Sequence, residues 1–427
     1  MSTYGETDVL VAGGGPAGMG AALAAARGGA KTLLLERHAF FGGVASHALG
    51  MPINQMRPAD RARGAIHEMV IEHVLAYGPE AGGMVRHALV CNVDYLRVAV
   101  MDALESAGVD YLLHTQVIDA LMDGNRITGA VIATKQGPAE ILAKSVVDAT
   151  GDADVTFFSG AETLKGRDGD GFLSPMTLLL MITNVDVDGA RAWQRDGGYR
   201  GIVDQAREKY PLIPQSIHFE LGPFPIRNAL VINHGGTKAR GSLDASLPEE
   251  ITEAERYSRR QAIQITNALR EFGGPAFANV QLAATGPQIG VRETRRIKGE
   301  YVLTEEDALS GQRFDDVIAW RSGWLDIGFV RFDKMKIHDV PYRALLPEKV
   351  DGLLAAGRCI SATHVAASAG KSMGNCMATG HAAGLAAAMA AGRGCAPRDL
   401  PVADIQAALT ADGVDLTRGG SDQDWLT

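Results

Sequence analysis

A glycine-rich turn between an apolar strand and an Ala-rich helix is the feature that most constrains how this chain can fold. Residues 8–13 form a short apolar run that ends in glycine, which predicts a buried strand. Residues 16–27 are rich in Ala and begin with Pro16, which predicts a helix with proline in its first turn. Residues 31–36 predict a second strand. A strand, a helix and a strand within about 30 residues form a parallel β-α-β unit, so the sequence predicts an α/β fold with a Rossmann-like domain.

The turn at 13–18 has the GxGxxG spacing of dinucleotide-binding sites. Gly13 permits the tight turn, Gly15 lets the backbone approach a pyrophosphate, and Gly18 permits close packing of the helix on the strand. The start of the helix offers free N–H groups and a partial positive charge to the phosphates. Glu36 ends the second predicted strand, where it can accept hydrogen bonds from ribose hydroxyls. This combination predicts a dinucleotide site, and the alternative is a purely structural glycine turn.

The later pattern divides the predicted nucleotide domain into two parts of the chain. Beyond Glu36 we predict a Gly-rich loop at 40–54, helices at 59–77 and 94–107, and a strand at 109–113. Three short strands at 117–121, 127–134 and 139–142 and a buried strand at 144–150 follow. A strand at 352–356 and a long Ala/Gly helix at 374–392 return to the first type of pattern. We therefore expect a discontinuous Rossmann-like domain at 1–154 and 336–395. Between its parts lies an inserted mixed α+β substrate domain at 155–335, and after them a polar tail at 396–427 with at most one short helix near 403–411.

Composition excludes several other classes of protein. The chain has 427 residues, with 41 Lys and Arg against 50 Asp and Glu, a net charge of −9 that argues against nucleic-acid and membrane-surface binding. Its 4 cysteines are far apart, which argues against a zinc ribbon, a disulfide framework or a redox-active dithiol, and we predict no metal site. The start of the chain has no basic segment before its apolar run, and the Ala-rich stretch 373–392 predicts a buried helix packed on a flat surface. We expect a cytoplasmic protein.

Five segments together carry a resemblance to a known family. They are the turn 13–18 with Glu36 and Gly42-Gly43, and the segments 148–154 (DATGDAD), 290–299 (GVRETRRIKG), 353–361 (LLAAGRCIS) and 373–384. As a set they resemble FAD-dependent oxidoreductases with a glutathione-reductase-like FAD-binding fold, distantly related to flavoproteins of the fumarate-reductase and tricarballylate-dehydrogenase type.

The resemblance implies that FAD binds with its adenine end at 13–36, with Gly357 and Arg358 near the pyrophosphate and ribityl chain, and with the helix from Gly374 pointing at the flavin pyrimidine. Small residues there would let the ring approach the backbone. The alternative is a tightly packed small-residue helix. Lys371 stands where the family commonly has arginine. The predicted cofactor-binding residues are Gly13, Gly15, Pro16, Ala17, Gly18, Glu36, Arg37, Gly42, Gly43, Val117, Ala149, Thr150, Gly151, Asp152, Gly357, Arg358, Met373 and Gly374.

Oxidation by FAD also needs a base when the substrate is an alcohol or an amine. His364, between the 357–358 turn and the last helix, is the first candidate, and His338 and His47 are the others; each could instead have only a packing role. His47 could also contact the flavin or be covalently attached to it.

Charged residues near the middle of the chain leave two interpretations open. Arg292 with Arg295 and Arg296, on one face of a predicted helix, is either an anion clamp or part of an ion-pair network with Glu293, Glu300 or Asp326. Asp152 and Asp154 are either caps of the following helix or catalytic acids.

The sequence thus predicts an FAD-dependent oxidoreductase that dehydrogenates a small polar organic substrate by hydride transfer to flavin N5. Arg292 or Lys371 would orient the substrate, and oxygen or a redox partner would accept the electrons. No second GxGxxG follows a strand, so we expect no separate NAD(P)H domain. Two alternatives remain: a flavin-dependent isomerase or hydratase without net redox, and an electron-transferring subunit that acts with a partner. The oligomeric state, including a homo-oligomer, is left open.

Overall fold

A computed structural model describes residues 2–58, 61, 63–220, 226–234, 236–322, 325–326, 331–332 and 336–418. Its largest sheet, here called the main sheet, has 7 strands in the order β5-β2-β1-β8-β7-β6, with β19 also paired to β8. The strands are β1 (Ser2–Ala12), β2 (Thr32–Leu35), β5 (Asp110–Leu112), β6 (Gln116–Asp123), β7 (Arg126–Thr134), β8 (Gly137–Asp148) and β19 (Leu353–Ala355). Strands β5, β2, β1, β8 and β19 are parallel, which confirms the Rossmann-like α/β prediction.

Strand β8 joins two kinds of sheet. Its first half pairs antiparallel with β7, and its second half pairs with β19 on the same edge. The predicted strands at 139–142 and 144–150 are therefore one continuous strand. Because β19 lies beside β8, the two parts of the predicted discontinuous domain share one sheet.

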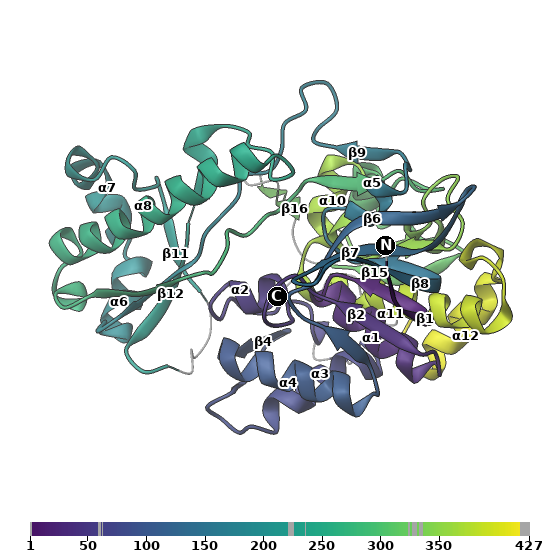
Figure 1. The fold of residues 1–427 in the computed structure, drawn as a ribbon. Coiled ribbons are helices and arrows are strands. Elements are labelled where there is room, and N and C mark those ends of the chain that lie inside the picture. Colours follow the sequence, from purple (N-terminus) through teal and green to yellow (C-terminus); the bar gives the residue numbers. More distant parts are fainter. Residues whose placement is uncertain are drawn as a thin grey trace.

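Helices α1 (Pro16–Arg27) and α11 (Met373–Arg393) pack against each other below the main sheet (Figure 1). Small residues permit this contact: a Cβ at Gly380 would lie 2.0 Å from the Ala17 carbonyl oxygen, and one at Gly384 would lie 2.0 Å from that of Ala21. The Ala- and Gly-rich stretch is thus a buried helix, as predicted, but much of its close contact is with a helix. None of the helices in the described ranges has the length and apolar character needed to span a membrane.

The remaining elements around the main sheet are mostly short. They are α2 (Val44–His47), α3 (Ala65–Leu75), β3 (Gly82–Val85), β4 (Ala88–Cys91), α4 (Val93–Ser106), α5 (Asp154–Phe158), β9 (Thr163–Lys165), β14 (Arg295–Ile297), α9 (Glu305–Ser310), β15 (Val317–Arg321), β16 (Leu325–Asp326), β17 (Arg331–Phe332), β18 (His338–Pro341), α10 (His364–Gly370) and α12 (Val402–Ala411). Helices α3 and α4 match the predicted helices within a few residues where described, and α12 confirms the short helix in the tail.

A second sheet of 4 antiparallel strands has the order β11-β12-β10-β13. Its strands are β10 (Leu180–Thr183), β11 (Ile217–Phe219), β12 (Ala229–His234) and β13 (Gln281–Thr285), and its helices are α6 (Val187–Arg195), α7 (Gly198–Lys209) and α8 (Pro248–Phe272). This part has its own buried core, in which Leu180, Phe219, Ile265 and Phe277 meet, and Figure 1 shows it beside the main sheet. The boundaries at 154, 335 and 395 stay predictions.

Candidate active site

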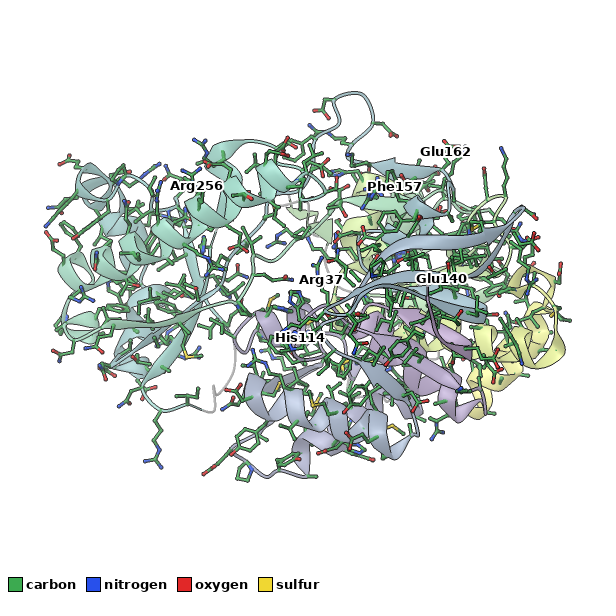
Figure 2. The ribbon with its side chains drawn as sticks, viewed as in Figure 1. Arg37, His114, Glu140, Phe157, Glu162 and Arg256 are labelled. Carbon is green, nitrogen blue, oxygen red and sulfur yellow. The ribbon has the colours of Figure 1, made fainter. Side chains whose placement is uncertain are left out.

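One cleft, with a volume of about 400 Å³, runs between the carboxyl ends of the parallel strands and the second sheet. Ligands of open α/β sheets bind at this edge, because the loops there leave a crevice. Figure 2 labels Arg37 and His114, which follow β2 and β5, at this place between the two parts of the molecule. The predicted site residues on the cleft lining are Gly13, Gly15, Pro16, Ala17, Glu36, Arg37, Gly43, His47, Val117, Ala149, Thr150, Gly151, Asp152, Arg292, Arg358 and Met373.

The three fingerprint glycines differ in their surroundings. Gly13 has φ +98°, and a Cβ there would lie 2.6 Å from the Ala149 carbonyl oxygen. At Gly18, which is not on the lining, a Cβ would lie 1.7 Å from the Gly13 carbonyl oxygen, so this residue permits the helix to pack on the turn. At Gly15 the nearest atom would be the Gly43 Cα at 3.9 Å. Gly15 therefore leaves open space on the cleft side of the turn.

Glu36 holds the turn together as well as lining the cleft. Its Oε2 accepts a hydrogen bond from the Gly14 N–H at 2.9 Å, and its Oε1 accepts one from the His38 N–H at 2.8 Å. Gly42 has φ +106° and donates its N–H to the Gly14 carbonyl at 2.8 Å. Gly42 lies behind the lining, and Gly43 beside it closes the loop over the first turn of α1.

The segment after β8 forms ion pairs with residues that are far away in the sequence. Asp152 pairs with the Arg358 Nη2 at 2.6 Å and also accepts from the Thr294 hydroxyl. Asp154 pairs with Arg295. The interpretation of both aspartates as helix caps is wrong, because the N-cap of α5 is Ala153 and no side chain caps that helix.

Gly357 and Gly374 lie behind the cleft lining and serve packing. A Cβ at Gly357 would lie 2.7 Å from the Ala17 Cβ, so the turn there can approach α1. A Cβ at Gly374 would lie 2.1 Å from the Gln55 carbonyl oxygen. The small residue at 374 thus makes room for the loop at 54–55, and the neighbouring residues Lys371, Ser372 and Met373 face the cleft.

Among the three predicted histidines, only His47 is on the lining. Its Nδ1 donates to the Gly43 carbonyl, which leaves Nε2 as the acceptor, and within the described part of the chain the buried Nε2 has no hydrogen-bond partner. Burial lowers the pKa of His47 to about 4, so the ring is neutral at pH 7.

His364 and His338 are buried away from the lining. The His364 Nδ1 lies 2.8 Å from the Glu293 carboxylate, at the start of α10. His338 is 0% exposed and its Nδ1 donates to the Lys336 carbonyl at 3.2 Å. A direct contact of either ring with a ligand in this cleft would need the structure to change.

The arginines at 292, 295 and 296 do not share a helical face. Residues 295–297 form strand β14, which points neighbouring side chains in opposite directions. Arg296 is buried and pairs with Glu293, while Arg295 pairs with Asp154. The ion-pair interpretation is thus right for Arg295 and Arg296, though Arg295 has a different partner from those expected. Asp326 lies outside the residues whose side chains are described. Arg292 lines the cleft.

Sequence reasoning missed the residues that the second sheet and the loop near 54 bring to the cleft. They are Met51, Asn54, Gln55, Thr177, Leu179, Asn233, Gln288 and Ile289. These residues belong to no spaced motif, and only the pairing of strands from distant parts of the chain gathers them.

Comparison with known proteins agrees with this geometry. A family model described as "FAD dependent oxidoreductase" matches residues 8–409. The chain belongs to the FAD-dependent oxidoreductase family. The cofactor of this flavoprotein is therefore FAD.

The chain is also similar to individual proteins whose names differ from one another. It is 30% identical over 220 residues to thiamine thiazole synthase of Methanococcus vannielii, across 48% of this chain and 73% of that protein. It is 31% identical over 156 residues to digeranylgeranylglycerophospholipid reductase of Picrophilus torridus, across 34% of this chain and 39% of that protein. A solved geranylgeranyl bacteriochlorophyll reductase-like protein of Thermoplasma acidophilum is 16% identical with a TM-score of 0.47, over 96% of this chain and 82% of that chain.

The cleft residues fit FAD. Besides His47, two partly buried side chains of the lining carry buried polar atoms with no partner in the described ranges: the Arg358 Nη1 and the Ser372 Oγ. The first turns of α1 and α11 contain no acidic residue, and no side chain caps either helix. The partial positive charge at these two helix starts and an arginine donor suit a pyrophosphate and the polar edge of a flavin.

Proposed function

We propose that this flavoprotein dehydrogenates a small polar organic substrate in the part of the cleft between α11 and the second sheet. FAD, when bound, supplies the hydride acceptor, and oxygen or a redox partner takes the electrons afterwards. The observation that carries the proposal is the continuity of the cleft. Its lining passes from Gly15 to Met373 and on to Thr177 and Leu179 of the second sheet region. A cofactor that reached from the fingerprint to α11 would thus leave the far wall for a substrate.

Two cationic side chains on the lining, Arg292 and Lys371, are our candidates for orienting the substrate. A guanidinium and an ammonium favour a carboxylate or another anionic group. We therefore place the polar end of the substrate on the side of these two residues and its reacting C–H bond toward the cofactor.

His47 is the best placed base. Its hydrogen bond to Gly43 holds Nε2 as the acceptor nitrogen, and this atom belongs to a residue of the lining. Burial lowers the pKa of His47 to about 4, which makes it a weak base. An anion bound nearby raises the pKa of a histidine, so substrate binding would bring His47 closer to the operating pH. His364 is the weaker candidate, since Glu293 holds it behind the wall of the cleft.

The test is anaerobic bleaching of the flavin absorbance by a panel of small alcohols, amines and hydroxy acids. His47→Asn keeps a donor for the Gly43 carbonyl and removes Nε2, so bleaching by an active compound should slow by about 10²-fold or more with the flavin spectrum retained. His364→Asn is the matched control and should slow it much less. Bleaching at the wild-type rate in the His47→Asn variant would show that His47 is not the base.

One relative is named a synthase, so the non-redox alternative is worth a separate measurement. Mass analysis of the product decides it. A product two hydrogens lighter than the substrate supports dehydrogenation, and turnover to a product of unchanged oxidation state would contradict it.

A further inference from the structure

Two buried arginines surround the first turn of α11. The exposed fractions of Arg63 and Arg321 are 5% and 1%. Neither has a carboxylate partner among the residues that the structure describes. Burial is the main cause of the pKa shift of both guanidinium groups. Although burial lowers their pKa values to about 9 for Arg63 and about 10 for Arg321, both stay positively charged at pH 7.

Arg321 lies directly behind the wall of the cleft. Its guanidinium packs on Gly370 so closely that a Cβ at that glycine would lie 1.9 Å from the Arg321 Cζ. Residues 369 and 371, on either side of the glycine, are both on the lining. The Arg321 Nε and Nη1 are buried and have no hydrogen-bond partner in the described ranges.

Arg63 is linked to the same wall by hydrogen bonds. Its Nη2 donates to the Asn375 Oδ1 at 2.8 Å, in the first turn of α11. The Asn375 Nδ2 donates to the Ser322 carbonyl at 2.7 Å, and the Ser322 hydroxyl donates to Gln55. Gln55 is on the cleft lining.

The positive charges of Arg321 and Arg63 add to the partial positive charge at the start of α11. The N-terminus of a long helix carries about half a positive charge, and the first turn of α11 has no acidic residue to offset it. Burying a guanidinium without a counter-charge is costly. A fold that keeps two of them at one helix start is stabilised when a negative charge binds there.

We propose that Arg321 and Arg63 hold the FAD of this protein in its anionic form after two-electron reduction and so raise its midpoint potential. The proposal rests on the proposed function and on the position of the flavin pyrimidine at the start of α11, which the resemblance to the family implies. The substrate C–H bond breaks and delivers two electrons and one proton to the cofactor as hydride, so the cofactor gains one negative charge. The second proton of the substrate goes to the base, and both electrons leave later to oxygen or a redox partner.

The rival source of negative charge is an anionic substrate. In that case a substrate carboxylate would pair with the two arginines. Without substrate, the arginines would then have no effect on the cofactor. The experiment is therefore done without substrate, on the full-length protein loaded with FAD.

The measurement is the midpoint potential of bound FAD between pH 6 and pH 8, against a dye of known potential. When one proton accompanies two electrons, a tenfold change in proton concentration shifts the potential by about 30 mV; with two protons the shift is about 59 mV. We expect the one-proton slope in the wild type. The other titratable groups near this turn are Lys371, Cys376, His67 and His338. Burial lowers the pKa of His67 to about 3 and that of His338 to about 4, so neither histidine changes charge in this range.

Arg321→Met should weaken the preference of the protein for reduced over oxidised FAD at least tenfold, which lowers the midpoint potential by about 30 mV. It should also steepen the pH dependence of the potential toward the two-proton value. Arg321→Lys should restore much of both. Arg256→Met is the control, because Arg256 lies on α8, is 61% exposed and is not among the residues that line the cleft. Figure 2 labels it apart from the lining residue Arg37. If Arg321→Met does not fold, Arg63→Met takes its place, with a shift in the same direction.

The outcomes separate the two proposals. A wild-type protein that binds FAD but shows the two-proton slope, or an Arg321→Met variant with unchanged potential and slope, overturns the role of the arginines and leaves the proposed function standing. An Arg321→Lys variant as impaired as Arg321→Met would also refute the role of the charge. A protein that shows no flavin absorbance after reconstitution with FAD overturns both.

Discussion

Gly15→Ala separates the binding of FAD from the folding of the protein. Gly15 is the N-cap of α1 with φ −73° and ψ −174°, which alanine adopts without strain. A Cβ there would have no neighbour nearer than the Gly43 Cα at 3.9 Å. The new methyl group would instead project into the cleft, where we place the pyrophosphate.

The expected magnitudes follow from this geometry. Alanine is a poorer N-cap than glycine by a fraction of a kcal/mol, while loss of glycine lowers the entropy of the unfolded chain by a similar amount, so the free energy of unfolding without FAD should change by less than about 1 kcal/mol. We expect the Kd for FAD to rise at least tenfold, which is about 1.4 kcal/mol. At an FAD concentration 100 times the wild-type Kd, ligand binding stabilises the wild type by about 2.7 kcal/mol and would stabilise the variant by about 1.4 kcal/mol.

The assay is urea unfolding with and without FAD, combined with titration of FAD followed by quenching of its fluorescence. Gly18→Ala is the matched variant from the same turn; its Cβ would lie 1.7 Å from the Gly13 carbonyl oxygen, so it should destabilise the protein even without FAD. Gly201→Ala, within α7 and with open space around it, should bind FAD normally and be more stable by up to about 1 kcal/mol.

Wild-type affinity for FAD in the Gly15→Ala variant would refute the assignment of this turn to the cofactor. Unfolding of the same variant in the absence of FAD would show instead that the turn is a structural element, which is the alternative that the sequence leaves open.

Three further predictions concern stability. Gly380→Ala should lower the free energy of unfolding by about 1–3 kcal/mol, since its Cβ would lie 2.0 Å from the Ala17 carbonyl oxygen. Gly392→Ala in the same helix has open space around it and should not destabilise the protein. Equal urea midpoints of the two variants would contradict this prediction. Asp152→Asn removes the counter-charge 2.6 Å from the Arg358 Nη2. Because each of the two side chains is only 19% exposed, the free energy of unfolding should fall by about 2–3 kcal/mol. A fall of less than about 0.5 kcal/mol would mean that solvent compensates the charge of Arg358. Burial lowers the pKa values of His67, His234 and His338 to about 3, 4 and 4, so the unfolded chain takes up protons below pH 6.5 that the folded protein takes up only near pH 4. The free energy of unfolding should therefore fall by several kcal/mol from pH 7 to pH 5, and a flat profile would show that these rings are protonated in the folded state.

Much of the fold and of the fingerprint end of the cleft was predictable, because the relevant interactions are local. The spacing of Gly13, Gly15 and Gly18 determines a turn whose close contacts lie within a few residues or on the adjacent strand. The apolar runs at β1, β2 and β19 likewise predict buried parallel strands from their own composition. The FAD contacts of individual residues, and the domain boundaries, stay predictions.

The opposite wall of the cleft was not predictable in this way. A regular spacing of arginines suggested one helical face, but the pairing of β14 with β9 makes that segment a strand and sends each arginine to a different partner. His364 follows the flavin-type turn closely in sequence, yet Glu293 holds it behind the lining.

The sequence by itself determined that this chain builds a dinucleotide turn on a parallel sheet, since a tight turn and a close helix contact depend on residues a few positions apart. Only the tertiary structure decided which of the three predicted histidines faces the cleft and where the arginines without a carboxylate partner are buried. Those outcomes depend on the pairing of strands and helices that are hundreds of residues apart, and no local pattern records which of them will meet.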